Sequence, residues 1–181
     1  MPRRTFLAPI LAALALVALS LTVSACGYSS DSKDVVEGEV VELGDLKYQV
    51  VFSRFLNPND NEDAAYLVDQ PPPADGSSYF GIFLEVQNKS EETQKLASSF
   101  TITDAGHQTF KALPSSSLYA FPFGGKVESQ EPIPAPDSTP QQGPIEGSLV
   151  LFELPSEASE NRPLTLSIAG PDGPAEVKLD L

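Results

Sequence analysis

Hydrophobic residues stand at every second position through most of the chain beyond residue 35, and this spacing constrains the fold more than any other feature. It is clearest in Leu46–Phe52, Phe80–Gln87, Phe100–Thr103, Leu164–Ile168 and Val177–Leu181. Successive side chains of a strand point to opposite faces, so these runs predict strands with one buried and one solvated face. By this pattern Phe52 shares the buried face with Leu46, and Phe83 lies on the solvated face.

Turn-forming residues separate these runs, and no window predicts a long amphipathic helix. Asp104–His107 predicts a hairpin in which Gly106 takes a positive φ, and Pro155 ends the run Ser148–Leu154. That run is apolar on both faces, which predicts a central place in its sheet. Without helices to cover a sheet, two sheets must cover each other. We therefore expect an all-β sandwich of about seven to nine strands over residues 35–181.

Residues 1–25 have the organisation of a secretory signal peptide. A basic segment at Arg3 and Arg4 precedes the apolar stretch Phe6–Leu19, and small residues follow it. A signal peptide is removed on export, so this segment is excluded from the folded domain. Arg3–Leu7 also resembles the twin-arginine export motif, which leaves general secretion and twin-arginine export as alternatives.

The only cysteine of the chain follows the apolar stretch. Val23–Cys26 resembles the lipobox of bacterial lipoproteins, in which small residues precede an invariant cysteine. The resemblance implies that Cys26 carries a diacylglyceryl group and that cleavage between Ala25 and Cys26 makes this cysteine the first mature residue. Residues 26–34 are then the lipidated cysteine and a flexible tether. The alternatives are an ordinary secretory signal and an uncleaved anchor formed by Phe6–Ala25.

Three segments of the chain follow one another in a familiar order. A hydrophobic strand ending in Asn88 is followed by the hairpin Asp104–Gly106 and later by the apolar strand Glu146–Pro155. The succession resembles the immunoglobulin-like domain of many bacterial surface lipoproteins, the domain of unknown function 4352. It is also similar in architecture to the mycobacterial immunoprotective extracellular protein. The resemblance implies an immunoglobulin-like fold and a cell-envelope location, but no activity.

Charge and the scarcity of two residue types exclude several classes of protein. There are 25 acidic residues against 11 basic ones, for a net charge of −14, so no basic surface remains to bind nucleic acid. The telomere-binding label that automated names sometimes give this family is therefore not taken literally. One cysteine and one histidine exclude a disulfide scaffold and a zinc finger. The histidine, His107, is expected in an exposed turn, and no nucleophile elbow occurs, so we expect no enzymatic activity.

The richest cluster of oxygen ligands lies in the loop Asn57–Asp63. The candidate calcium ligands are Asn59, Asp60, Asn61 and Asp63. The loop lacks the central glycine of an EF-hand, and its favoured interpretation is a solvated connection between strands. A weak calcium site is the alternative, and no other cofactor is expected.

Leu118–Gly125 contains three aromatic residues among glycine and proline. If Tyr119, Phe121 and Phe123 are exposed together, they form a patch suited to a protein or a polysaccharide. The alternative is that the rings fold back and cap one end of the sandwich. The proline-rich segment Glu131–Pro144 is expected as an extended linker or edge segment.

Together these features predict a protein anchored by lipid to the extracytoplasmic face of the cell membrane. Its domain is expected to act as a binding or accessory module for an unknown envelope protein or polysaccharide. One alternative is a structural or shielding lipoprotein without a dedicated ligand. A more distant alternative is an enzyme acting on envelope glycans, which requires two carboxylates brought together in a cleft.

Overall fold

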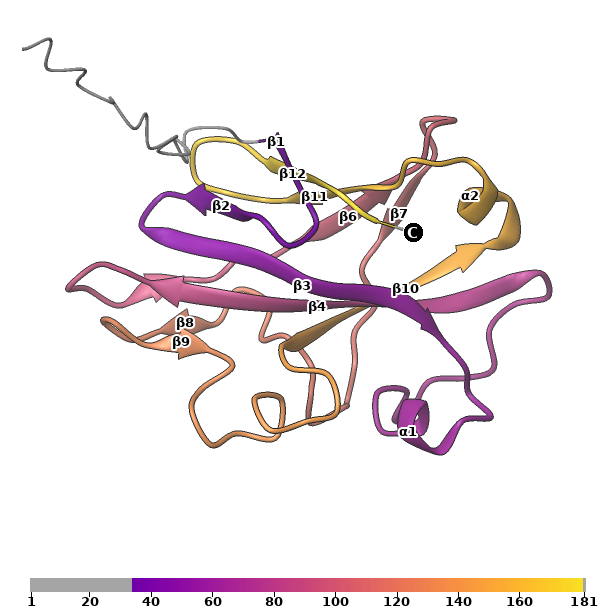
Figure 1. The fold of residues 1–181 in the computed structure, drawn as a ribbon, viewed down its shortest axis with the longest axis horizontal. Helices are drawn as coiled ribbons and strands as arrows, with labels where there is room; N and C mark the ends of the chain where they lie inside the picture. The colour runs from indigo at the N-terminus through magenta and orange to yellow at the C-terminus, as the bar shows by residue number, and fades with distance from the viewer. Residues whose placement is uncertain (1–33, 181) are drawn as a thin grey trace, which may run out of the picture.

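Two β-sheets packed face to face form the described part of the chain, residues 34–180 of a computed structural model (Figure 1). In spatial order, the first sheet contains β1 (Asp34–Val36), β12 (Ala175–Lys178), β11 (Thr165–Ile168), β6 (Phe100–Thr103) and β7 (Thr109–Lys111). The second contains β10 (Ser148–Pro155), β4 (Ser77–Asn88), β3 (Leu46–Leu56) and β2 (Val40–Leu43), with β9 (Pro132–Ile133) also paired to β4. The remaining elements are the small sheet of β5 (Gln94–Lys95) and β8 (Lys126–Val127) and the helices α1 (Asn61–Ala64) and α2 (Ser156–Glu160). The predicted all-β sandwich is confirmed.

The strand order is that of an immunoglobulin-like sandwich. β6, β11 and β12 lie in the order of strands C, F and G of that fold, and β3, β4 and β10 lie in the order of A, B and E. β1 pairs in parallel with β12, while the other pairs are antiparallel. The described chain therefore begins at one edge of the first sheet, beside its last strand.

The interior between the sheets contains one face of nearly every long strand. Its largest fully buried side chains include Tyr48, Phe80, Phe100 and Phe152. Full burial of such a side chain contributes about 1.5–3 kcal/mol each to folding. The Tyr48 hydroxyl accepts a hydrogen bond from the Ala97 amide (2.8 Å). The polar end of this ring is therefore satisfied inside the core.

β4 is buried on both faces, which its alternating pattern did not predict. Phe83 is 0% exposed, and its ring lies edge-on to that of Tyr66, with centroids 5.1 Å apart. Leu149 and Leu151 of β10 belong to the same second cluster. Segments 57–76 and 113–147 fold back over this outer face of the second sheet (Figure 1). The prediction that Phe83 faces solvent is wrong because distant segments cover it.

β10 lies at the end of its sheet, so the central place predicted for this apolar strand is also wrong. Its free edge is covered by another segment. The Leu113 amide donates to the Leu151 carbonyl (2.7 Å), and the Phe121 amide donates to the Leu149 carbonyl (2.8 Å). The continuous apolar run therefore reflects burial on two faces, and its edge bonds satisfy polar groups that would otherwise invite pairing with another chain.

A β-bulge in β3 reverses the expected facing of one aromatic residue. The register with β4 shifts between Val50 and Phe52. Beyond the bulge Phe52 points outward and is 44% exposed, while Ser53 points inward and donates its hydroxyl to the Glu37 carboxylate (2.6 Å). The prediction that Phe52 is buried with Leu46 is therefore wrong.

The hairpin predicted at Asp104–His107 joins β6 and β7. The positive φ belongs to His107 (65°) rather than to Gly106. Asp104 is buried and accepts a hydrogen bond from the Gln108 amide (2.9 Å), which fixes the turn through its own side chain.

Candidate functional site

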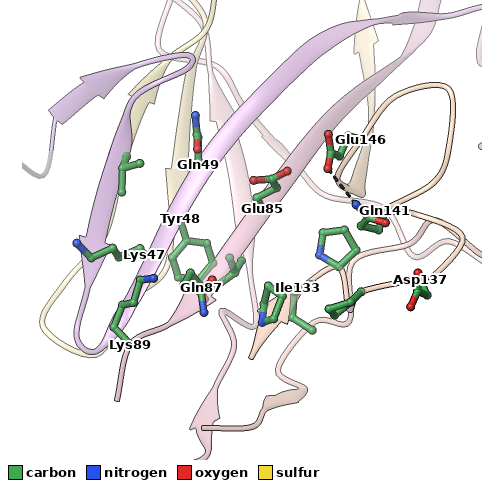
Figure 2. A pocket seen from close by; sticks show the side chains of 15 residues that line it. Lys47, Tyr48, Gln49, Glu85, Gln87, Lys89, Ile133, Asp137, Gln141 and Glu146 are labelled. Carbon is green, nitrogen blue, oxygen red and sulfur yellow. Dashed lines mark hydrogen bonds between the residues drawn. The ribbon is translucent and has the colours of Figure 1, made fainter. Parts of the chain in front are cut away.

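A groove of about 520 Å³ crosses the outer face of the second sheet (Figure 2). Its floor contains the outward side chains of β3 and β4, namely Lys47, Gln49, Glu85 and Gln87. Its wall contains Pro132, Ile133, Pro134 and Pro136 together with Gln141 and Glu146. This volume lies within the range of small-molecule sites. We therefore treat the groove as the candidate site.

The position of Glu85 follows from the pairing of β4. β10 pairs with β4 as far as Leu84, and β9 resumes pairing on that edge at Val86. Glu85 lies between these two neighbours, and Glu146 stands two residues before β10 begins. Two carboxyl groups from distant parts of the chain therefore line the same groove.

Asn88, at the end of β4, fixes the wall of the groove. Its buried side-chain nitrogen donates to the carbonyls of Glu92 (2.7 Å) and Glu128 (3.0 Å). Its side-chain oxygen accepts from the Ser90 amide (2.9 Å) and its backbone amide donates to the Glu131 carbonyl (3.1 Å). Because Glu131 directly precedes β9, these bonds hold the start of the proline-rich wall against β4.

Burial and a neighbouring like charge act on Glu85. Burial is the larger cause that raises the pKa of the Glu85 carboxyl, and the charge of Glu146 raises it further. Lys47 does not offset the repulsion between Glu85 and Glu146, because its ammonium nitrogen is paired with Glu42, 2.7 Å from Oε1. The groove therefore holds an acid that ionises less readily in the free protein than an ordinary glutamate does.

We expect Glu85→Gln to raise the free energy of unfolding at pH 7. The pKa of Glu85 is higher in the folded state than its ordinary value of 4.5, so ionisation destabilises the fold as pH rises through the folded-state pKa. The variant lacks this charge, and its advantage should disappear below about pH 4, where both states bind the proton. Urea unfolding followed by circular dichroism at pH 7 and pH 4 measures this difference. An advantage equal at both pH values contradicts the electrostatic cause.

The three aromatic residues of segment 118–125 do not form one exposed patch. Phe121 is 2% exposed, and its ring packs edge-on to Phe100 and Phe123 in the core between the sheets. Tyr119 is partly buried and packs against Tyr66 on the outer side of the second sheet, with ring centroids 4.7 Å apart. The rings serve two different cores, so the structure does not support the binding loop predicted at Tyr119, Phe121 and Phe123. In this stretch Leu118 is 79% exposed, and Pro122 is exposed as well.

The acidic loop before α1 uses its oxygens within the protein. Asp63 is buried and forms a two-pronged ion pair with Arg54, and it also accepts a hydrogen bond from the Asn57 amide (2.7 Å). Asp60 caps α1 by accepting from the Glu62 amide (2.8 Å). Asn59 and Asn61 are exposed. Within residues 34–180, the structure gathers no group of three His, Cys, Asp or Glu side chains that could hold a metal ion. Of the candidate calcium ligands Asn59, Asp60, Asn61 and Asp63, the two carboxylates are thus bonded to groups of the protein itself.

Two further predicted residues lie apart from the groove. His107 is exposed in the β6–β7 hairpin and does not line the groove. Cys26 and the predicted cleavage position at Ala25 lie outside the described residues. Among helices in residues 34–180, none has the length and apolar character needed to cross a membrane.

The sequence analysis did not predict the groove, although it identified both the polar face and the proline-rich segment that form it. The polar positions Lys47, Gln49, Glu85 and Gln87 alternate with buried ones in β3 and β4, which predicted a solvated face. The proline-rich segment was expected as a linker or edge. Two of its residues pair with β4 as the short edge strand β9, which fits the edge alternative, and Pro134, Pro136, Asp137 and Gln141 form a wall over the polar face. No spacing in the sequence relates residues 132–146 to residue 85.

Comparison with known proteins finds solved structures of similar fold, but it does not assign the chain to a family. No family model matches the chain, and no match was found among curated proteins. Among solved structures, the chain is similar to the yjhA protein from Bacillus subtilis, with a TM-score of 0.53 and 15% identity, covering 80% of this chain and 99% of that one. At this identity the similarity shows a shared fold alone.

Two other solved structures are similar at lower TM-scores. An uncharacterized β-sandwich protein from Clostridium difficile has a TM-score of 0.49 and 14% identity, covering 81% of this chain and 93% of that one. A Bacillus subtilis protein provisionally described as a lipoprotein has a TM-score of 0.46 and 11% identity, covering 80% of this chain and 38% of that one. These neighbours thus include one protein described as a β-sandwich and one provisionally described as a lipoprotein, and none gives the family predicted from the sequence.

Proposed function

We propose that this protein is a bacterial lipoprotein held by Cys26 on the extracytoplasmic face of the cell membrane, where its β-sandwich binds a ligand without turnover. The observation that carries the anchor is the only cysteine of the chain, standing directly after an apolar segment that ends in small residues. Two acyl chains bind a membrane stably where one does not. The membership in the domain family predicted from the sequence is part of this proposal.

The groove supports a binding role over a purely shielding one. A shielding domain has no need of a walled cavity whose floor holds a partly buried acid beside a second acid. Absence of turnover is proposed because the sole imidazole, His107, stands away from the groove, which leaves its carboxyl groups without a neighbouring histidine base. The expected partners are the membrane, through the lipid, and an envelope component in the groove.

The anchor is tested by replacing Cys26 with serine. Cells expressing the wild-type chain with a palmitate analogue should yield labelled protein in the membrane fraction. Cys26→Ser should lose the label completely, because serine has no thiol to accept the diacylglyceryl group. Ser29→Ala, a matched change in the tether, should remain labelled. Equal labelling of wild type and Cys26→Ser contradicts the proposal.

A second candidate function is favoured by the pair Glu85 and Glu146. Two carboxylates in a cleft, one with a raised pKa, are the minimal set for glycoside hydrolysis. Among residues 34–180, the only aromatic residue that lines the groove is Tyr48, which is 2% exposed, so this part of the chain offers no ring there for a sugar to stack on. Release of reducing ends from soluble envelope glycan, abolished by Glu85→Gln, would favour hydrolysis over simple binding.

A further inference from the structure

The carboxylate of Glu85 has no partner of its own in the described structure. Within residues 34–180 it accepts no hydrogen bond and joins no ion pair, although it is only partly exposed. The other charged groups that line the groove are Glu146, Asp137, Lys47 and Lys89. Lys47 is paired with Glu42, as described above. No described residue therefore neutralises the negative charge of Glu85, and a bound cation could do so.

The neighbouring amides offer further acceptors. Nε2 of Gln49 donates to the Gly38 carbonyl (2.9 Å), and Nε2 of Gln87 donates to the Gln130 carbonyl (3.0 Å). These bonds fix the orientation of both amides, since only the nitrogen can donate. No residue in 34–180 donates to either side-chain oxygen. The floor of the groove therefore presents acceptors, which suits a ligand rich in donors.

The charges of the groove are distributed unevenly. Figure 2 shows Glu85 and Glu146 toward one end and Lys47 and Lys89 toward the other. Nε2 of Gln141 donates to Oε1 of Glu146 (3.3 Å), which holds this carboxylate at the wall. Beside the acids, Ile133 and the flanking prolines supply an apolar surface. The site thus combines an acidic end, an apolar wall and a basic end.

We propose that the groove binds a primary ammonium group carried on an aliphatic chain, with the ammonium between Glu85 and Glu146 and the chain against Ile133 and Pro134. This inference rests on the proposed binding function and specifies its ligand chemistry. An ammonium supplies three donors and one positive charge, which match the acceptors of the floor and relieve the repulsion between the two acids. In the free protein burial raises the pKa of Glu85, and the charge of Glu146 raises it further.

Two sources carry this chemistry: a lysine-type side chain of a peptide, and a free diamine. Lys89, whose ammonium has no partner within residues 34–180, lies at the end of the groove opposite the acids (Figure 2). It favours a ligand that carries a negative group at its far end and disfavours a second positive charge there. We therefore expect the amino-acid form to bind more tightly than the diamine.

Isothermal titration of the purified full-length chain in detergent tests the inference at pH 7.5 with three probes. Nα-acetyl-L-lysine should bind, cadaverine should bind more weakly, and Nα-acetyl-L-norleucine, which lacks the ammonium, should not bind. Glu85→Gln should weaken binding of Nα-acetyl-L-lysine by about 10- to 100-fold, the loss of a charge-assisted hydrogen bond. Glu176→Gln removes the same charge from the exposed face of β12 and should leave the affinity unchanged.

The possible results of the titration test the ammonium site independently of the lipid anchor. Tighter binding of cadaverine than of the lysine derivative would retain the ammonium site and assign the free diamine as its source. Equal binding of the norleucine derivative, an unchanged affinity in Glu85→Gln, or no binding of any amine would overturn the inference. Palmitate labelling at Cys26 in that same preparation would leave the lipoprotein proposal standing, because the anchor does not depend on the groove.

Discussion

Replacing Phe83 with alanine is expected to lower the free energy of unfolding by about 3–5 kcal/mol, the usual cost of truncating a buried phenylalanine. Phe83 is 0% exposed and contacts the Tyr66 ring on the outer side of the second sheet. Removal of its ring leaves a cavity among Leu149, Leu151 and Tyr66, whose backbones are held by strand pairing and by a bond to the Asp63 carbonyl. The chain has no tryptophan, so urea unfolding is followed by circular dichroism.

Phe52→Ala is the matched control for this change. Phe52 pairs directly with Phe83 in the register of β3 and β4, but it is 44% exposed. Its truncation is expected to cost about 1–2 kcal/mol, clearly less than at Phe83, since only part of its apolar surface is removed from water in the folded state. Equal costs at the two positions would show that the second cluster does not bury the outer face of the sheet in solution.

Asp63→Ala is expected to lower the free energy of unfolding by about 2–4 kcal/mol, somewhat less than the usual cost of breaking a fully buried ion pair. The substitution removes both prongs of the pair with Arg54 and the acceptor of the Asn57 amide. The Arg54 side chain remains 31% exposed, so water partly solvates the charge left behind, which is the reason for the lower value.

Two further variants separate the charge from the hydrogen bonds. Glu62→Ala removes an exposed acid from the same helix and should change stability by less than about 0.5 kcal/mol. Asp63→Asn keeps an acceptor for the Asn57 amide but loses the charge, so its cost should fall between those of the other two. A cost for Asp63→Ala as small as that of Glu62→Ala would contradict a structural role for the ion pair.

The groove forms only when distant segments of the folded chain meet, and the alternating sequence pattern does not show such contacts. The outward positions of β3 and β4 were expected to be polar and solvated, and Gln49 and Glu85 are indeed outward. The wall that converts this face into a groove comes from residues 132–146, which the proline content suggested only as an extended segment. Its placement depends on Asn88, whose side chain reaches carbonyls about 40 residues further along the chain. Such a link has no local spacing by which to find it.

The aromatic segment 118–125 shows a second limit of sequence-based prediction: residues that are close in sequence can lie far apart in the fold. Composition grouped Tyr119, Phe121 and Phe123 as one feature, because they are close in sequence. Phe121 and Tyr119 pack on opposite sides of the second sheet, since the segment runs along the edge of β10 with its amide and carbonyl groups bonded to Leu149. Residues two apart in a regular strand share a face, but Tyr119 lies in a turn and, of this segment, only Ala120 bridges to β10, so the irregular backbone sends the two rings to different sides.

The period of two determined the strands, their inward faces and the sandwich, because alternation is a property of the extended backbone itself and needs no distant partner. Tertiary structure alone decided which outer faces are covered, where β3 bulges, and which acids meet. Phe83 is buried and Phe52 exposed although both occupy similar apolar runs, because segments 57–76 and 113–147 return over one part of the sheet and not the other. Those returns depend on contacts between residues far apart in the chain.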